Sequence, residues 1–128
     1  MAVLTREDIR QWLVSQGFQP EERSFGYHFR YQMLNYYIEY DQEEDDQYLR
    51  VIMPGIYDMD ENNRLEVLSA ANEVDSTRKV IKCFVPDDSV HIAAELLVDQ
   101  SPDLGDIIPR AIRMLQSGRD VFYEALKK

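Results

Sequence analysis

The sequence predicts an α+β domain in which helices pack against one antiparallel sheet. Residues 80–98 have the pattern of a β-hairpin, with β-branched runs on either side of a turn sequence at 86–89. Residues 25–53 have the pattern of three further strands with short connections. Helical periodicity lies before, between and after these two groups, so the predicted order is α-β-β-β-α-β-β-α. Strands that follow one another in this way are typical of an α+β fold with a single five-stranded sheet.

Residues 4–18 predict the first helix, with signals at both ends. Thr5 can cap the free N–H groups, and Asp8 lies at the reciprocal position of a capping box. Apolar residues at helical spacing, such as Leu13, form a narrow stripe on one face. Gly17 suits the left-handed residue that follows a helix, and a proline shortly afterwards prevents continuation.

The next three elements are strands, expected at 25–33, 36–40 and 48–53. In the first of them, aromatic and apolar residues occupy every second position, which indicates one aromatic face. Pro54 and Gly55 end the third strand. Short connections make the three strands an antiparallel meander.

An acidic run at 41–46 connects the second and third strands and carries five carboxylates. An EF-hand calcium loop requires glycine at its sixth position and glutamate at its twelfth, where this sequence has Asp46 and Ile52. Blocks of like charge are usually solvated. We therefore expect an exposed loop that binds no metal and is dispensable for folding.

The second helix is expected from a polar cluster at 58–63 to about residue 74. Its core face is predicted to consist of Leu65, Leu68, Ala71 and Val74. The hairpin follows, with strands at 80–85 and 90–98, and its second strand is expected to lie beside the strand at 48–53.

The last helix is expected to open at residues 101–103. Its apolar residues recur at helical spacing and form one continuous seam: Leu104, Ile108, Ala111, Leu115, Gly118, Phe122 and Leu126. Pro109 lacks an amide hydrogen, so it fits the first turn if Asp106 is the N-cap and otherwise predicts a kink.

Length and charge limit the classes of function. The chain has 128 residues, which predicts one domain over residues 1–128, and a net charge of −10. An acidic protein repels nucleic acid phosphates and anionic lipids, so we expect neither nucleic acid nor a membrane as a partner. The single cysteine and the absence of an apolar leader sequence favour the cytoplasm.

The sequence contains no recognisable arrangement of catalytic or metal-binding residues. One cysteine and two distant histidines, His28 and His91, give no zinc-ligand spacing, so we expect no metal and no cofactor. Phosphate-binding glycine loops and nucleophile elbows are absent. Cys83 and His91 could meet across the hairpin as a nucleophile pair, although strand cysteines are mostly buried hydrophobic residues. The chain is therefore not expected to be an enzyme.

Tyrosine is the most informative excess, with six of the eight tyrosines between positions 27 and 48. Tyr27, Tyr36, Tyr37 and Tyr48 are the candidate partner-binding residues, because tyrosine is favoured at protein interfaces. The alternative is that these side chains pack beneath the helices, as aromatic residues in strands often do. The residues alone leave both interpretations open.

The chain as a whole resembles the YbjN-like family of small bacterial proteins. The resemblance rests on residues 35–40, the acidic run, residues 48–54, and the segments 71–75 and 79–82. Similar members carry Asn-x-x-Asn at the end of the second helix and a lysine in the next strand. Asn72 and Lys82 match this pattern, whereas Asp75 replaces the second asparagine. We expect all three to be structural, with the Asn72 amide placed to bond free carbonyls at the helix end or the following strand.

The family resemblance implies a fold shared with class I type III secretion chaperones and no known enzymatic activity. It favours a non-catalytic cytoplasmic bacterial protein that binds another polypeptide or a second copy of itself, in a regulatory or adaptor role. The alternative that it implies is a secretion chaperone that holds a secreted protein in extended form.

Overall fold

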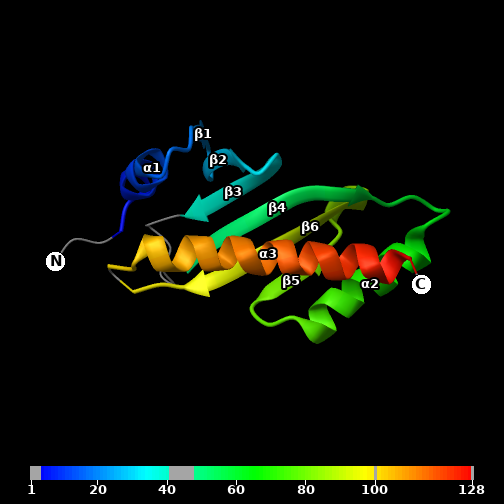
Figure 1. Ribbon diagram of the computed structural model, residues 1–128. Helices are drawn as coiled ribbons and strands as arrows, with labels where there is room; N and C mark the ends of the chain where they lie inside the picture. The colour runs from blue at the N-terminus through cyan, green and yellow to red at the C-terminus, as the bar shows by residue number, and fades with distance from the viewer. Residues whose placement is uncertain (1–3, 41–47, 100, 128) are drawn as a thin grey trace.

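The computed structural model describes residues 4–40, 48–99 and 101–127, and over these residues it has an α+β fold of three α-helices and one six-stranded antiparallel sheet (Figure 1). The elements in chain order are α1 (Arg6–Ser15), β1 (Glu21–Arg23), β2 (Gly26–Tyr31), β3 (Leu34–Tyr40), β4 (Tyr48–Asp58), α2 (Arg64–Thr77), β5 (Ile81–Phe84), the short 3₁₀ helix η1 (Pro86–Asp88), β6 (Ser89–Leu97) and α3 (Leu104–Leu126).

The strand order across the sheet is β1-β2-β3-β4-β6-β5. The expectation that the last hairpin strand lies beside the third strand is confirmed, because β6 pairs with β4. The predicted number of five strands is wrong. The additional strand, β1, consists of three exposed charged residues and carries no apolar pattern that sequence reasoning could detect. It forms because its backbone pairs with β2, with Glu21 opposite His28.

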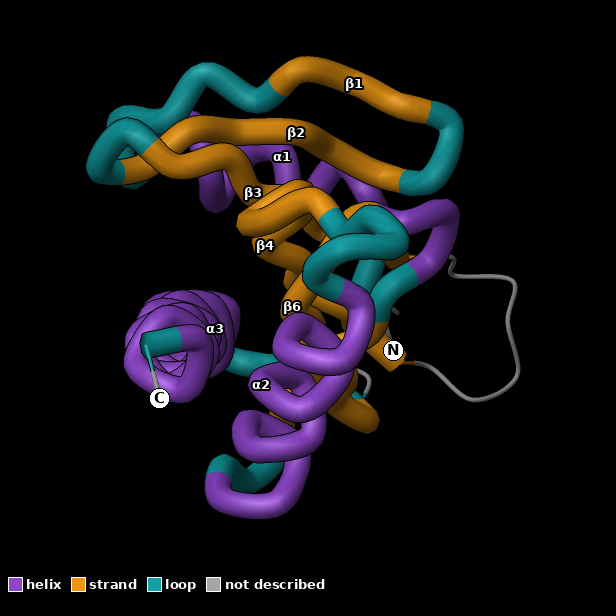
Figure 2. The backbone as a smooth tube through the Cα atoms, turned by 90° about the vertical axis from the view of Figure 1, so that its right-hand side faces the viewer, coloured by secondary structure: helices purple, strands orange, loops and turns teal. Residues whose placement is uncertain are grey.

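All three helices lie on one face of the sheet. Helix α3 runs along the front of the sheet in Figure 1, and Figure 2 shows β1 and β2 at the end of the sheet farthest from α2. Helix residues and strand residues share one buried cluster. Its largest fully buried side chains are Tyr36, Phe29, Phe122, Ile9, Leu13, Ile38, Leu49, Met53, Ile92, Ile108, Leu115 and Val51. No helix of the described residues is both long enough and apolar enough to cross a bilayer.

The predicted ends of the first helix are confirmed. The Thr5 hydroxyl accepts a hydrogen bond from the Asp8 N–H at 3.1 Å, and the Thr5 N–H donates to the Asp8 carboxylate at 2.9 Å. These two bonds form the capping box. Gly17 follows the helix with φ of 89°, in the left-handed region that glycine adopts without steric cost.

The predicted core face of the second helix is partly wrong. Leu65 and Leu68 are exposed, and the buried residues of α2 are Val67, Ala70, Ala71 and Val74. The buried stripe is made of small side chains because α3 passes close to it. A Cβ atom at Gly118 of α3 would lie 2.5 Å from the Ile81 side chain and 3.5 Å from Val74. Leucine side chains in this stripe would hold the two helices apart.

The apolar seam of the last helix is largely confirmed. The helix does not begin at Asp106, the N-cap that would have placed Pro109 in its first turn. Asp103 is the N-cap, and its carboxylate accepts from the Asp106 N–H at 3.3 Å. The helix therefore begins one turn before Asp106 and continues through Pro109. Of the predicted seam, Leu126 is only partly buried, at the end of the helix.

Two strand boundaries differ from the prediction. Strand β4 continues past Pro54 and Gly55 to Asp58, with a shift in its pairing to β6 between Met53 and Tyr57. Strand β5 begins at Ile81, since Val80 has φ of 76° and cannot pair in an extended conformation. A β-branched residue at positive φ is strained, because its Cβ atom crowds the backbone.

Replacing Val80 with glycine should stabilise the protein. Val80→Gly removes the steric cost of positive φ and loses only a half-exposed side chain, so we expect a gain of about 0.5–1 kcal/mol. Urea denaturation measures the change. The control Val80→Ala keeps the Cβ atom and should gain nothing; an equal gain in both variants would show that the strain is not the cause.

One side chain fastens α2 to the strand that follows it. The Asp75 carboxylate accepts a hydrogen bond from the Cys83 N–H of β5 at 2.6 Å. Asn72 is exposed, and its side chain forms no hydrogen bond with the described residues, so it does not make the expected bond to the helix end or the following strand. The reason is its place on α2, on the opposite side from the buried stripe. Lys82 is exposed and pairs with Glu95 of β6.

The difference between these two α2 positions predicts different effects on stability. Asp75→Ala leaves the Cys83 amide without its acceptor and should cost about 1–2 kcal/mol. Asn72→Ala should change stability by no more than about 0.5 kcal/mol. Thermal and urea unfolding of the two variants compare these effects directly. A large loss for Asn72→Ala with none for Asp75→Ala would contradict the assignment.

Candidate functional site

One face of the sheet is covered by none of the three helices. Residues opposite each other in neighbouring strands point to the same face. The register places Tyr37 opposite Ile52, Ile52 opposite Ala93, and Ala93 opposite Lys82, so one row crosses β3, β4, β6 and β5. Ile52 and Ala93 are buried, yet they lie outside the buried cluster that the helices share. We call the face that carries this row the open face.

A second row on the open face is charged. Arg50 lies at its centre, opposite Glu39 on one side and Glu95 on the other. The Arg50 Nη1 atom is 3.0 Å from the Glu39 carboxylate, and its Nε atom is 3.9 Å from that of Glu95. Lys82 also pairs with Glu95. The two acids and two bases balance, although the buried Arg50 Nε atom has no hydrogen-bond partner among the described residues.

Aromatic rings lie on both sides of the charged row. On the β5 side, the Phe84 ring is 5.2 Å from the Arg50 guanidinium and 5.3 Å from the Lys82 ammonium, which is within reach of cation–π attraction. On the β2 side, the Tyr37 ring packs edge-on against Phe25, with centroids 5.2 Å apart. The open face therefore combines apolar rings with fixed charges.

The four predicted partner-binding tyrosines divide between the two faces. Tyr37 and Tyr48 are on the open face, and Tyr48 lies opposite Leu97, whose exposed fraction is 82%. Tyr27 and Tyr36 face the helices and are 5% and 0% exposed, so they are core residues and cannot contact a partner from the folded chain. Adjacent residues of a strand, such as Tyr36 and Tyr37, point to opposite faces of the sheet. This alternation alone shows that the four tyrosines cannot all belong to one binding surface.

The Cys83–His91 nucleophile pair does not exist. Cys83 faces the helices, whereas His91 lies opposite Phe84 on the open face. Burial, and then the nearby Asp75 carboxylate, raises the pKa of the Cys83 thiol to about 12. Such a thiol forms almost no thiolate at neutral pH. The acidic run at 41–46 lies outside the described residues.

The place of His91 on the open face predicts that the stability of the fold depends on pH. Its Nδ1 atom accepts a hydrogen bond from the Gly55 N–H at 3.0 Å, where β4 changes its pairing with β6. Burial, together with the nearby Arg50 guanidinium, lowers the pKa of His91 from its ordinary value of 6.5. Between the two pKa values the unfolded chain binds more protons than the folded chain, so stability falls as the pH drops below 6.5.

Removing the titrating ring should weaken this pH dependence. His91→Gln keeps a hydrogen-bond acceptor for the Gly55 amide but cannot be protonated. Between about pH 7 and about pH 5 the variant should lose less stability than the wild type, because only the wild type takes up this proton on unfolding. Urea midpoints measured across the range test this. Parallel losses in the two proteins would assign the pH dependence to other groups.

Comparison with known proteins supports the fold. No family model matches the chain, and no curated protein matches its sequence. YbjN from E. coli, a proposed transcription regulator, has a TM-score of 0.72 at 16% identity, with 98% of this chain and 93% of that chain covered. An uncharacterized protein from Methanothermobacter thermautotrophicus has a TM-score of 0.64 at 16% identity, with 97% and 98% covered. The chain therefore has a YbjN-like fold over nearly its whole length.

Proposed function

We propose that this chain is a non-catalytic, cytoplasmic protein that binds another polypeptide through the open face, in a regulatory or adaptor role. The observation that carries the proposal is the uncovered face itself. It presents an exposed apolar pair, Tyr48 and Leu97, beside the charged row centred on Arg50. Tyrosine and arginine are both enriched at the centres of protein interfaces.

The charged row supplies specificity rather than most of the affinity. Its ion pairs are partly exposed, and such pairs contribute little free energy on their own. They do hold the Arg50 guanidinium in one place, so that a partner meets a fixed pattern of charge. The net charge of −10 attracts a basic polypeptide over a longer range.

The two sheet edges are poor sites for adding a strand from a partner. At one edge, β1 is short and carries only charged residues, a combination that discourages pairing. At the other edge, the outward N–H of Cys83 in β5 is already bonded to Asp75. This blocked geometry favours binding on the face over binding along an edge. It also counts against the secretion-chaperone alternative, in which an extended polypeptide would be held.

The negative net charge of the chain favours a regulatory role based on binding proteins over one based on binding DNA. YbjN, whose fold is similar, is described as a proposed transcription regulator. A chain with a net charge of −10 repels DNA phosphates. A regulatory function for this chain would therefore depend on contacts with another protein.

Removing the exposed apolar pair should weaken partner binding. The double variant Tyr48→Ser with Leu97→Ser changes only exposed side chains, so the fold should persist. Immobilised wild-type protein is incubated with native extract, and each retained protein is then purified and titrated against the chain. We expect affinity for a true partner to fall about tenfold or more in the double variant. Light scattering reports whether that partner is a second copy.

The matched control is Leu65→Ser, which removes a leucine of similar exposure on α2, away from the open face. This control should bind as the wild type does. If all three proteins retain the same partners with equal affinity, the open face is not the binding surface. Recovery of a secreted protein in extended form would instead support the chaperone alternative.

A further inference from the structure

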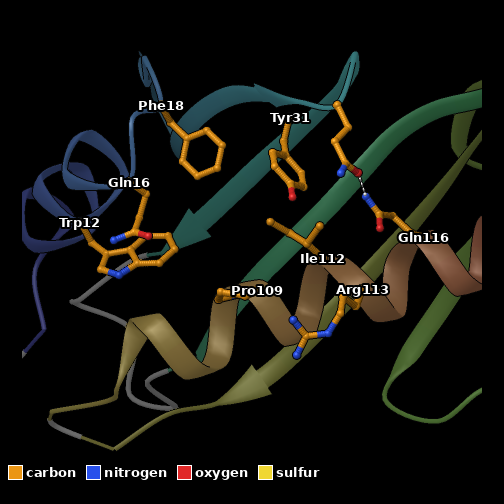
Figure 3. A pocket seen from close by; sticks show the side chains of 9 residues that line it. Trp12, Gln16, Phe18, Tyr31, Pro109, Ile112, Arg113 and Gln116 are labelled. Carbon is orange, nitrogen blue, oxygen red and sulfur yellow. Dashed lines mark hydrogen bonds between the residues drawn. The ribbon is translucent and has the colours of Figure 1, made fainter.

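A pocket of about 450 Å³ opens on the helix side of the molecule, between α1, the β2–β3 turn and the first half of α3 (Figure 3). Three aromatic side chains line it, Phe18 and Tyr31 from above and Trp12 of α1 from the left, and Pro109 and Ile112 of α3 line it from below. The volume lies in the range of sites for small ligands. This pocket is on the opposite side of the sheet from the open face.

Contacts within the chain hold the walls of the pocket in place. Phe18 packs edge-on against Tyr31, with ring centroids 5.7 Å apart. The Gln116 amide of α3 donates to the Gln32 side chain at 3.0 Å and to the Tyr36 hydroxyl at 3.2 Å. These bonds join α3 to the β2–β3 hairpin. Because the walls are already ordered, little conformational entropy of the protein is lost when a ligand binds.

The hairpin wall is also strained. Gln32 and Met33 form a two-residue turn in which both have positive φ, of 51° and 66°. Such turns favour asparagine and glycine, because larger residues crowd the backbone. Met33 is 88% exposed, so its side chain contributes nothing to the core. Strain of this kind persists where surrounding contacts enforce it, and here the Gln116 bond ties the turn to the pocket.

The charge of the pocket is opposite to that of the chain. Among the residues that the structure describes, Arg113 is the only charged one that lines the pocket, and none of the lining residues is acidic. Arg113 is exposed and forms no hydrogen bond or ion pair with the described residues. Arg110, one turn earlier in α3, instead pairs with Asp106 at 3.3 Å. A chain with a net charge of −10 thus presents an unpaired guanidinium beside an aromatic pocket.

We propose that this pocket binds a carboxylate with a planar apolar body. The ring of the ligand lies among Trp12, Phe18 and Tyr31, and its carboxylate pairs with the Arg113 guanidinium, whose planar fork matches two carboxylate oxygens. A free aromatic acid and the C-terminal aromatic residue of a polypeptide share this chemistry. The proposal does not depend on the function assigned to the open face.

The chain supplies its own reporter, because Trp12 is its only tryptophan and lines the pocket. Phenylacetate is titrated while tryptophan fluorescence is recorded, with neutral phenylacetamide as the comparison ligand. We expect a saturable change with phenylacetate and about tenfold weaker binding of phenylacetamide, which lacks the charge. The tripeptide Gly-Gly-Phe, with a free or an amidated C-terminus, tests the polypeptide source.

Two variants on α3 distinguish a direct contact between Arg113 and the carboxylate from a general attraction of the anion to positive charge. Arg113→Gln should weaken binding of phenylacetate about tenfold, because it removes the pairing group. Arg110→Gln removes the same charge outside the pocket and should leave the affinity unchanged. Tighter binding of the free acid, or of the tripeptide acid, supports the proposal and identifies the source. The proposal is overturned if neither acid gives saturation, if acid and amide bind equally, or if Arg113→Gln binds as the wild type does.

Discussion

The close approach of α3 to α2 and β5 is the contact on which the architecture depends. A Cβ atom at Gly118 would lie 2.5 Å from the end of the Ile81 side chain, so the side chains of β5 and α2 pack directly against the backbone of α3. The small residues of α2 allow this approach, and the long seam of α3 then covers the sheet from one side. Because the buried faces of all three helices pack on this one side of the sheet, no helix covers the other side.

Much of the fold could be predicted because its signals are local. The Thr5 capping box, the Gly17 stop and the α3 seam are all visible in the sequence, since each depends on residues within a few turns of one another. The strand β1 could not be predicted, because it exists through backbone pairing alone. The buried stripe of α2 was predicted only in part, at Ala71 and Val74, for a related reason. Its choice of alanine over leucine is set by a helix more than thirty residues away.

The candidate surfaces were less predictable than the fold. The tyrosine excess drew attention to β2, β3 and β4, but two of the four candidate tyrosines are buried, and only strand alternation separates Tyr37 from the buried Tyr36. The aromatic pocket was not foreseen at all, because it is assembled from α1, a turn and α3. Most of its residues are ordinary core-forming types in sequence, and Arg113, which pairs with none of the described residues, distinguishes the site. The open face and the pocket therefore offer different chemistry, with ion pairs in the one and a single guanidinium beside aromatic rings in the other.

The bond from Asp75 to the Cys83 amide also bears on how the protein behaves at high concentration. An apolar strand at the end of a sheet is a template on which further chains can stack, and such stacking leads to fibres. Strand β5 is apolar at Ile81, Cys83 and Phe84, although it is short and carries the exposed Lys82. A strand from another molecule that pairs with this edge needs the outward N–H groups of β5, and the N–H of Cys83 already donates to the Asp75 carboxylate. The side chain that attaches a helix thus also removes one of the donors through which such stacking would begin.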